Sequence, residues 1–416
     1  MKRCTFASKK IARKQQQNGV GKEKKSSCWR NMSKKSKHLH VISFDVPYPA
    51  NYGGVIDIYY KLVALSESGV KIHLHCYQYG RAESAMLKGV CHKVTYYRRK
   101  VFKNPIYNTK PYIVASRNST ALIENLLKDK YPILFEGLHS TYYLADDRLK
   151  ERYKVVRTHN IEHHYYKHLE KVEDNLFKRY FFKVESERLK KYESVLKHAN
   201  CIAAISPNDT KYLNKKYGKT ILLSPFHVNT AVNVEKGSGD FILYHGNLSV
   251  GENNEAALFL LKNVLSDAKY PVVIAGNDPS QELKVKVATM NHVLLETGIT
   301  SEEINHLISD AHINILYTNQ ATGIKLKLLN ALFMGRHCIA NDKMIANTGL
   351  ADLCIEANNA KAFKQAIKQC WEVEIGNDAI ESRTNVLQTR FDNQKNVLPL
   401  LDLIFGPQVE AVKTKV

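Results

Sequence analysis

The sequence contains no C-x-x-C pair, and its eight cysteines are scattered along the 416 residues. They do not cluster with histidines at the spacing of a zinc site. Several lie in apolar, strand-like runs, so we expect buried free thiols and a reducing, cytoplasmic compartment. The longest apolar run, AALFLLKNVL from Ala256, is interrupted by Lys262 and is too short for a membrane helix. No apolar segment near the N-terminus has the form of a secretory signal.

Several ligand-binding signatures are absent as well. The sequence has neither a G-x-G-x-x-G motif nor a G-x-x-x-x-G-K-[ST] motif, which disfavours the dinucleotide-binding and P-loop classes. It also has no D-x-D motif to hold a divalent cation. We therefore expect no metal and no cofactor.

The composition is that of a globular protein, with 44% hydrophobic and 24% charged residues. The length suits two domains better than one core. The formal net charge of +21 is unevenly spread, because residues 1–37 hold thirteen Lys or Arg and one acidic residue. More than half of the excess charge thus lies in a short, polar head.

The basic head, residues 1–37, cannot bury a core and is predicted to be disordered. Such a segment is typical of a nucleic-acid arm or of a tether to an anionic membrane surface. Alternatively, residues 1–31 derive from an upstream start, because Met32 stands just before the first strand. The rest of the chain shows no nucleic-acid module, so we expect no nucleic-acid partner. Peripheral association of the protein with the inner face of the membrane is an alternative to a purely cytoplasmic location.

Strand-like runs alternate with helical stretches between residues 38 and 228, which we predict to be the first domain. The predicted strands are 38–44, 70–77, 93–97, 132–136, 153–157, 201–205 and 220–224. The helix after the first strand has an expected apolar face of Ile56, Tyr59, Tyr60, Val63 and Leu65. Residues 163–198 are long, charged and helical in pattern. Alternation of this kind predicts a parallel sheet with helices on both faces.

A second domain is predicted at residues 239–390. Residues 224–240 carry Pro, Gly and Ser without periodicity and form the predicted linker. Strand–helix alternation then restarts at FILYHGN, residues 241–247, and continues through several strands. Residues 391–416 are predicted to be a C-terminal helix and tail, for which packing against the first domain is one option.

Two candidate sites follow predicted strands of the first domain, and ligands of such sheets bind at the carboxyl ends of strands. Gly53 and Gly54 follow the first strand, where glycines let the backbone approach a ligand and a helix start favours an anion. A tight structural turn is the alternative. His159 follows the strand YKVVR and suits a polar contact to a sugar or phosphate. A metal pair of His159 and His163 lacks an obvious third ligand, and a structural histidine is the other alternative.

The third candidate is the turn Thr322-Gly323-Ile324-Lys325, which follows the strand INILYT and leads into a helix. Backbone N–H groups at such a helix start are free to bind an anion. Lys325 and Lys327 add positive charge nearby. The turn is therefore predicted to hold a diphosphate, with solvated lysines as the alternative interpretation.

The sequence resembles the group-1 glycosyltransferases (family 4, retaining, GT-B fold) over residues 38–405. The resemblance rests on VPYPANYGG, VVRTHNIEHHYY, FILYHGNLSVGENNEAALFL, VVIAGNDP and ATGIKLKLLNALFMGRHCIAN, which occur in this order. It implies an α/β fold of two doubly wound Rossmann-like domains that face a central cleft. It also implies a metal-independent hexosyltransferase that uses a nucleotide diphosphate sugar and a glycan or lipid-linked acceptor, in cell-surface polysaccharide or glycoconjugate synthesis.

The resemblance implies roles for individual residues. His159 would contact the donor sugar near the reacting carbon, and is the predicted catalytic residue. The donor would be bound by residues of both domains: Gly53, Gly54, Gly246, Asn247, Thr322, Gly323, Ile324, Lys325 and Asn330.

The sequence also departs from the family. Thr322 and Asn330 stand where the family has glutamates, and Asn247 and Glu252 stand near the places of its Arg and Lys. A neutral amide still hydrogen-bonds a ribose, with a loss of about 1 kcal/mol relative to a carboxylate. The departures support an alternative function, a non-catalytic GT-B chain that binds a sugar nucleotide or a partner enzyme.

Overall fold

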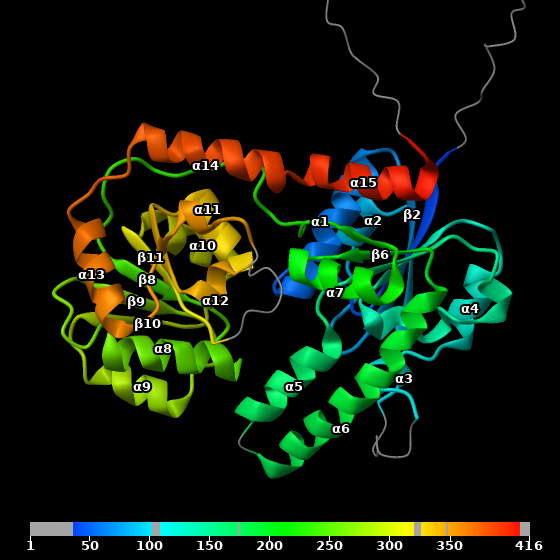
Figure 1. Cartoon of the computed structure of the whole chain (residues 1–416), viewed down its shortest axis with the longest axis horizontal. Coiled ribbons are helices and arrows are strands. Elements are labelled where there is room, and N and C mark those ends of the chain that lie inside the picture. The colour runs from blue at the N-terminus through cyan, green and yellow to red at the C-terminus, as the bar shows by residue number, and fades with distance from the viewer. Residues whose placement is uncertain (1–35, 102–108, 174, 320–325, 347, 408–416) are drawn as a thin grey trace, which may run out of the picture. The chain divides into compact units, whose positions relative to one another are not determined.

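A computed structural model describes residues 36–101, 109–173, 175–319, 326–346 and 348–407 (Figure 1). Residues 37–416 form one compact unit, and both sheets of the protein belong to it. The first sheet has the strand order β3-β2-β1-β4-β5-β6-β7, and the second has the order β10-β9-β8-β11-β12-β13. Neighbouring strands are parallel throughout both sheets. The predicted fold class of two Rossmann-like, parallel-sheet domains is confirmed.

The strands of each sheet are short and lie close to the predicted positions. The first sheet contains β1 (His38–Ser43), β2 (Lys71–Gln78), β3 (Lys93–Arg98), β4 (Ile133–Glu136), β5 (Lys154–Thr158), β6 (Cys201–Ala204) and β7 (Thr220–Leu222). The second contains β8 (Ile242–His245), β9 (Val272–Ala275), β10 (Val293–Glu296), β11 (Ile313–Leu316), β12 (His337–Ala340) and β13 (Ile355–Glu356). The two-residue edge strand β13 was not expected from the sequence.

Helices connect the strands of both sheets. In the first half of the chain these are α1 (Gly53–Glu67), α2 (Met86–Val90), α3 (Tyr112–Ala115), α4 (Thr120–Leu126), η2 (Leu138–Tyr143), η3 (Asp147–Leu149), α5 (Glu162–Val172), α6 (Leu176–Tyr192), η4 (Glu193–His198) and α7 (Pro207–Tyr217). The second half contains α8 (Gly251–Asn263), α9 (Gln281–Ala288), α10 (Ser301–Asp310), α11 (Leu326–Met334), α12 (Asp342–Ile345), η5 (Ala351–Leu353), α13 (Ala360–Trp371), α14 (Asn377–Arg390) and α15 (Asn393–Phe405).

Successive residues of the central strands pack on opposite faces of the first sheet. Leu134 of β4 belongs to an apolar cluster on one face, whereas Ile133 and Phe135 belong to a cluster on the other. Val155 and Val156 of β5 divide in the same way. Consecutive apolar residues in the central strands, such as Ile133 to Phe135 and Val155–Val156, are expected where both faces of a sheet are covered.

The buried surface of α1 is wider than the sequence indicated, and the predicted apolar face was wrong in part. Of its five residues only Leu65 is fully buried; Ile56, Tyr59, Tyr60 and Val63 are half-buried. The fully buried positions are Val55, Asp57, Ile58, Lys61, Leu62, Ala64 and Leu65. The difference arises because α1 packs against α15 as well as against the sheet, and because two charged residues point inward.

The charged segment 163–198 is divided into α5, α6 and η4 rather than forming one helix. The chain breaks before α6, where the Asn175 side chain accepts hydrogen bonds from the backbone N–H groups of Phe177 and Lys178, both at 3.1 Å. An asparagine N-cap of this kind starts a new helix. The helical periodicity was therefore recognised, but the cap that interrupts it was not.

The last helix, α15, packs on the first sheet's domain although it follows the second sheet in the chain. Its residues Val397, Leu400 and Leu401 belong to the apolar cluster that contains Leu39 and Leu62. The linker is joined by hydrogen bonds to the start of α15 and to the residues just before it. Asn393 Nδ2 donates to the backbone oxygen of His227 at 2.7 Å.

The cysteines of the described residues are free thiols. Five of the six are buried and Cys354 is half-buried, its sulfur 3.9 Å from that of Cys338. Among the helices of the described ranges, none is long and apolar enough to cross a membrane.

Candidate functional site

The candidate site lies at the carboxyl ends of β1, β4 and β5, which are neighbours in the first sheet. The order of strands reverses between β1 and β4, since β2 and β3 lie on one side and β5 to β7 on the other. Open α/β sheets bind ligands at such a switch point. The loops that leave these strands, together with the start of α1, therefore supply the side chains of the site.

A cluster of four buried charges lies beneath this edge. Lys61 Nζ donates to Asp57 Oδ2 at 2.9 Å and to Glu136 Oε2 at 3.0 Å. Arg157 donates to both carboxylate oxygens of Asp57, from Nε at 3.1 Å and from Nη2 at 2.8 Å. All four side chains are buried. Two cations thus balance two carboxylates, and the loss of any one leaves an uncompensated charge in the interior.

The charges around Asp57 keep it ionised. Burial alone would raise the pKa of Asp57, but Arg157 and Lys61 outweigh it and hold this pKa well below its usual value. Asp57 Oδ1 also accepts the backbone N–H of Phe226 at 2.9 Å. The carboxylate therefore ties α1 and β5 to the residues that lead into the linker.

His159 lies directly above this cluster. Its Nε2 is 3.1 Å from Glu136 Oε2, and its Nδ1 is 3.8 Å from Asp57 Oδ2. The ring of Phe44 meets it edge to face, with 5.5 Å between the centroids. Only 9% of the His159 side chain is exposed. The imidazole is thus fixed in orientation by a carboxylate and an aromatic ring, as an active-site histidine requires.

Asp57, Glu136 and His159 place one potential metal-ligand atom each within 4.8 Å of one another. Lys61 and Arg157 donate to both oxygens of Asp57 and to Glu136 Oε2, whereas Glu136 Oε1 has no hydrogen-bond partner among the described residues. The alternative pair of His159 and His163 is not brought together in this group, because His163 Nδ1 lies 3.2 Å from Glu193 Oε2. A metal ion at this group would lie beside the buried positive charges of Lys61 and Arg157, which disfavours its binding.

A cavity of about 520 Å³ adjoins His159. It is lined by Phe44, Tyr52, Gly53, Gly54, Asp57, His139, His159, Asn160, Glu162, Tyr165, Tyr166, Ile205 and Pro225 of the first half of the chain, and by Glu252, Asn253, Leu326 and Lys327 of the second. Three of the predicted site residues, Gly53, Gly54 and His159, thus line one cavity.

Glu162 and His139 form a second polar pair in this cavity, with 3.8 Å between Glu162 Oε1 and His139 Nδ1. Burial raises the pKa of Glu162 to about 8; Arg117 opposes this shift and Asp209 adds to it. Burial, with the charge of Arg117, lowers the pKa of His139 well below its usual value. At neutral pH the pair is therefore a neutral carboxylic acid beside a neutral imidazole. A buried neutral acid can donate a proton or a hydrogen bond to a ligand.

The raised pKa of Glu162 predicts how its replacement changes stability with pH. The folded chain holds a proton on Glu162 up to about pH 8, whereas the unfolded chain releases it near pH 4.5. The contribution of Glu162 to stability is thus present below pH 4.5 and lost as the pH rises toward 8. Glu162→Gln should therefore stabilise the protein more at pH 7 than at pH 5, by about 2–3 kcal/mol in the free energy of unfolding. Chemical denaturation of the parent and the variant at pH 5 and pH 7 measures this difference in the free energy of unfolding.

The control for this variant is Glu187→Gln, which removes an exposed carboxyl group of α6. It should change the stability equally at both pH values. An equal change for Glu162→Gln would mean that Glu162 is ionised in the folded protein at neutral pH.

The glycine pair has a packing role besides its place in the cavity. A Cβ atom on Gly54 would lie 2.7 Å from Phe44 Cζ, so the ring against His159 requires glycine here. A Cβ atom on Gly53 would meet only Leu326, at 3.9 Å. The glycine pair can therefore serve both as a tight structural turn and as part of a ligand site. Of the two glycines, Gly53 is the one whose backbone adjoins open space.

The predicted donor residues of the second domain are only partly described. Thr322, Gly323, Ile324 and Lys325 lie outside the described residues. Gly246 follows β8, and a Cβ atom there would lie 3.2 Å from Asn253 Cγ. Asn247 is exposed, and its Oδ1 accepts a hydrogen bond from Ser249 Oγ at 2.7 Å.

Asn330, the residue expected at a ribose, lies on α11. Its Oδ1 accepts a hydrogen bond from Asn229 Nδ2 of the linker at 3.0 Å. The side-chain oxygen of Asn330 is therefore hydrogen-bonded to the linker. The contact of Asn330 with a ribose stays a prediction.

The sequence did not reveal Asp57, Lys61 and Glu136. Asp57 and Lys61 are four residues apart on a helix, which reads as an exposed ion pair. Their partners Glu136 and Arg157 follow at separations of 75 and 100 residues. One signal was that Glu136 ends the otherwise apolar strand ILFE and that Arg157 directly follows two valines in β5, positions that are unusual for charged side chains.

Comparisons with known proteins agree with the geometry. Residues 239–372 match a family model described as "Glycosyl transferases group 1". A Klebsiella pneumoniae protein, described as an uncharacterized 44.6 kDa protein in the cps region, is 28% identical over 316 residues. The aligned part is 70% of this chain and 79% of that protein. The predicted resemblance to group 1 glycosyltransferases is thus confirmed in the second domain.

Solved structures show the same fold. A glycosyltransferase from Rickettsia africae superposes with a TM-score of 0.59 and 14% identity, over 89% of this chain and 99% of its own. Alr3699/HepE of Anabaena, in complex with UDP and glucose, gives a TM-score of 0.60 and 10% identity, over 88% and 98%. TarM of S. aureus, as a G117R mutant, gives 0.58 and 11%, over 89% and 100%. The architecture is the GT-B fold.

Proposed function

We propose that this chain, a GT-B protein whose second domain matches the group 1 glycosyltransferases, transfers a hexose from a nucleotide diphosphate sugar to a glycan or lipid-linked acceptor. The observation that carries the proposal is His159, which is held by Glu136 beside a cavity that both halves of the chain line. The Anabaena structure with UDP and glucose supports a sugar-nucleotide donor. The Klebsiella relative in the cps region supports a role in cell-surface polysaccharide or glycoconjugate synthesis.

In this proposal His159 contacts the donor sugar near the reacting carbon. Its ring is already oriented by Glu136, so no reorganisation is needed when charge develops in the transition state. The buried cluster of Lys61 and Arg157 fixes the carboxylates that hold the ring. Glu162, a neutral acid of the same cavity, is placed to donate a hydrogen bond to an acceptor or a sugar hydroxyl.

The diphosphate would be bound by the amides of Gly323, Ile324 and Lys325. Lys327 lines the cavity two residues further on, and its Nζ donates to Asn253 Oδ1 at 3.1 Å. Positive charge and N–H groups at this place would stabilise the leaving diphosphate.

The other predicted residues also take part in binding in this proposal. The backbone at Gly53 and Gly54 would approach the donor or the acceptor. Gly246 and Asn247 would begin the loop that binds the nucleotide. Thr322 would adjoin the diphosphate turn and Asn330 the ribose. Retention of configuration and independence of metal complete the proposal; both follow from the family resemblance.

Binding and transfer are tested together. Nucleotides and nucleotide sugars are screened by thermal shift, where a donor at 100 times its Kd adds about 2.7 kcal/mol of stability. Donors that bind are then assayed for release of the nucleotide with and without glycan acceptors. The proposal fails if no nucleotide sugar stabilises the chain and none is consumed.

Lys325→Ala is expected to weaken donor binding by about 1–2 kcal/mol, close to tenfold in Kd, because it removes a charged hydrogen bond to the diphosphate. Isothermal titration calorimetry with the donor from the screen measures this loss. Lys284→Ala, which removes an exposed lysine of α9, is the matched control and should leave Kd unchanged. Equal Kd values for the two variants would place the diphosphate elsewhere.

A non-catalytic GT-B chain is the second candidate function. It is favoured by Thr322 and Asn330 in place of glutamates, and by the hydrogen bond that joins Asn330 to Asn229 of the linker. Such a chain would show the thermal shift but no release of nucleotide with any acceptor. Turnover by the purified protein excludes it.

A further inference from the structure

Three large apolar side chains project into solvent at the start of α6. Leu176 is 76% exposed, Phe177 is 89% exposed and Tyr180 is 62% exposed. Figure 1 shows α5 and α6 side by side, as a helical hairpin that reaches away from the first sheet. The Asn175 cap fixes the first turn of α6, so these side chains stand on ordered backbone. We call Leu176, Phe177 and Tyr180 the apolar tip.

Basic side chains surround the apolar tip. Lys171, Lys178, Arg179 and Lys183 are exposed, and residues 171–183 contain two acidic residues against these four. An ordered helical turn with aromatic and aliphatic side chains, flanked by Lys and Arg, is typical of segments that lie in the interface of an anionic membrane.

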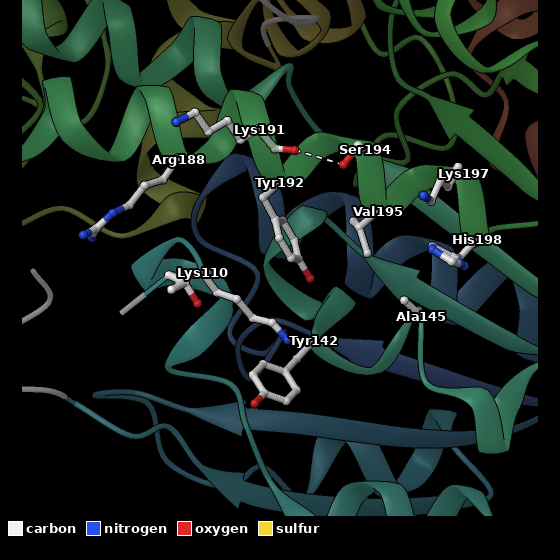
Figure 2. Close-up of a pocket in the computed structure, with 11 residues that line it drawn as sticks. Lys110, Tyr142, Ala145, Arg188, Lys191, Tyr192, Ser194, Val195, Lys197 and His198 are labelled. Carbon is white, nitrogen blue, oxygen red and sulfur yellow. Dashed lines mark hydrogen bonds between the residues drawn. The ribbon is translucent and has the colours of Figure 1, made fainter. Parts of the chain in front are cut away.

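The basic surface continues along α6. Phe177 and Arg188 are eleven residues apart, which is about three helical turns, so they lie on nearly the same face. Arg188 lines a pocket of about 720 Å³ on the first domain (Figure 2). Its lining residues are Thr109, Lys110, Tyr142, Ala145, Arg188, Lys191, Tyr192, Ser194, Val195, Lys197 and His198.

The lining of this pocket contains four Lys or Arg side chains together with His198, and no acidic side chain. Lys110 reaches to the ring of Tyr142, with 4.2 Å between Nζ and the ring centroid (Figure 2). Arg188 also donates to Glu185 Oε1 at 2.9 Å, which holds the guanidinium in place. The pocket is thus suited to phosphate groups of a lipid surface rather than to an apolar ligand.

We propose that the α5–α6 hairpin docks on an anionic membrane, with the apolar tip in the headgroup region and the basic side chains of α6 facing lipid phosphates. Charge complementarity selects this partner. Three side chains are also too few for a stable protein–protein interface, which buries roughly 800 Å² on each partner. A few apolar side chains with flanking lysines are sufficient for reversible membrane binding.

The hairpin connects the membrane surface to the candidate site. α5 begins three residues after His159, and its Tyr165 and Tyr166 line the cavity. Its eleven residues span about 16 Å, at 1.5 Å per residue. Docking of the hairpin would thus hold the cavity about 16 Å from the lipid surface. At that distance a lipid-linked acceptor can reach the cavity. The docking itself is independent of the proposed transferase function; only the use of a lipid-linked acceptor rests on it.

The test is flotation of the full chain with phosphatidylcholine vesicles that do or do not contain phosphatidylglycerol, at physiological salt. The double variant Leu176→Ser/Phe177→Ser should lower binding to the anionic vesicles about tenfold. The control Val285→Ser/Leu294→Ser removes two exposed apolar side chains of the second domain, 56% and 55% exposed, and should bind as the parent does. Equal binding of the parent and the double variant overturns the proposal.

A second measurement separates the hairpin from the basic head, which could also bind anionic lipid. The parent chain has Trp29, in the head, and Trp371, so both are first replaced by Phe. In this background, brominated lipids should quench the fluorescence of Phe177→Trp, whereas that of Val285→Trp should not be quenched. Vesicle binding without quenching at position 177 would overturn the proposal in favour of the head. If the double variant instead shifts the oligomeric state in light scattering without changing vesicle binding, the tip is a contact between copies and the proposal is wrong. Nucleotide release without vesicles is measured in parallel, so that loss of transferase activity is distinguished from loss of docking.

Discussion

His159→Ala is expected to lower kcat by about 10²–10³-fold, with donor affinity nearly unchanged. The reason is that the imidazole is placed at the reacting sugar rather than at the diphosphate, so its contact strengthens in the transition state. A hydrogen bond of 3.1 Å to Glu136 fixes the ring, and the neighbouring carboxylate of Asp57 is kept ionised by Arg157. Steady-state kinetics with the donor identified by thermal shift give kcat, and calorimetry gives Kd.

The matched control for this variant is His306→Ala, which removes an exposed histidine of α10 in the second domain. It should leave both kcat and Kd at the values of the parent. Thermal unfolding of His159→Ala should still be cooperative, because Lys61 continues to pair with Asp57 and Glu136. If His159→Ala retains most of its turnover, the imidazole does not take part in the reaction and the site has been misplaced.

Lys61→Met is expected to destabilise the protein by about 3–5 kcal/mol, the usual effect of breaking a buried ion pair by removal of one partner. Lys61 is fully buried and is bonded to Asp57 and Glu136, so its loss leaves the cluster one positive charge short. The midpoint of thermal unfolding should fall by about 4–6 °C. Differential scanning calorimetry measures the change.

The chain offers a matched exposed pair for comparison. Lys262 Nζ lies 2.6 Å from Glu282 Oε1, but both side chains are half or more exposed. Lys262→Met should therefore cost less than about 1 kcal/mol. Adding Glu136→Gln to Lys61→Met restores the balance of charge, and should recover part of the lost stability. Similar losses for Lys61→Met and Lys262→Met would mean that water reaches the cluster and screens it.

The sequence predicted the architecture because both sheets depend on local pattern. Most strands contain a short apolar run and are followed by a helix or turn that leads to the next strand; the second domain also matches the family model over residues 239–372. The edge strand β13 was missed since Ile355 and Glu356 are both exposed and carry no pattern. The break before α6 was missed because it depends on one asparagine cap.

The site was predicted less completely than the fold. His159, Gly53 and Gly54 were predicted because they lie in the segments that leave the carboxyl ends of β5 and β1, and the structure places all three in the lining of one cavity. Their roles stay predictions. Asp57 and Glu136 were not found, since their importance comes from contacts between segments far apart in the chain. Burial decides the state of Glu162, and the sequence around it gives no sign of that burial.

The packing of α15 has a consequence for how the protein is made. Val397, Leu400 and Leu401 complete the apolar cluster that contains Leu39 and Leu62, yet they are synthesised after the whole second sheet. During translation the first domain therefore leaves the ribosome with part of its core uncovered. We expect this core to be completed only after α15 has been synthesised. A fragment that ends at the linker should for the same reason be prone to aggregate, whereas a fragment that also carries α15 on a separate chain would have its core completed.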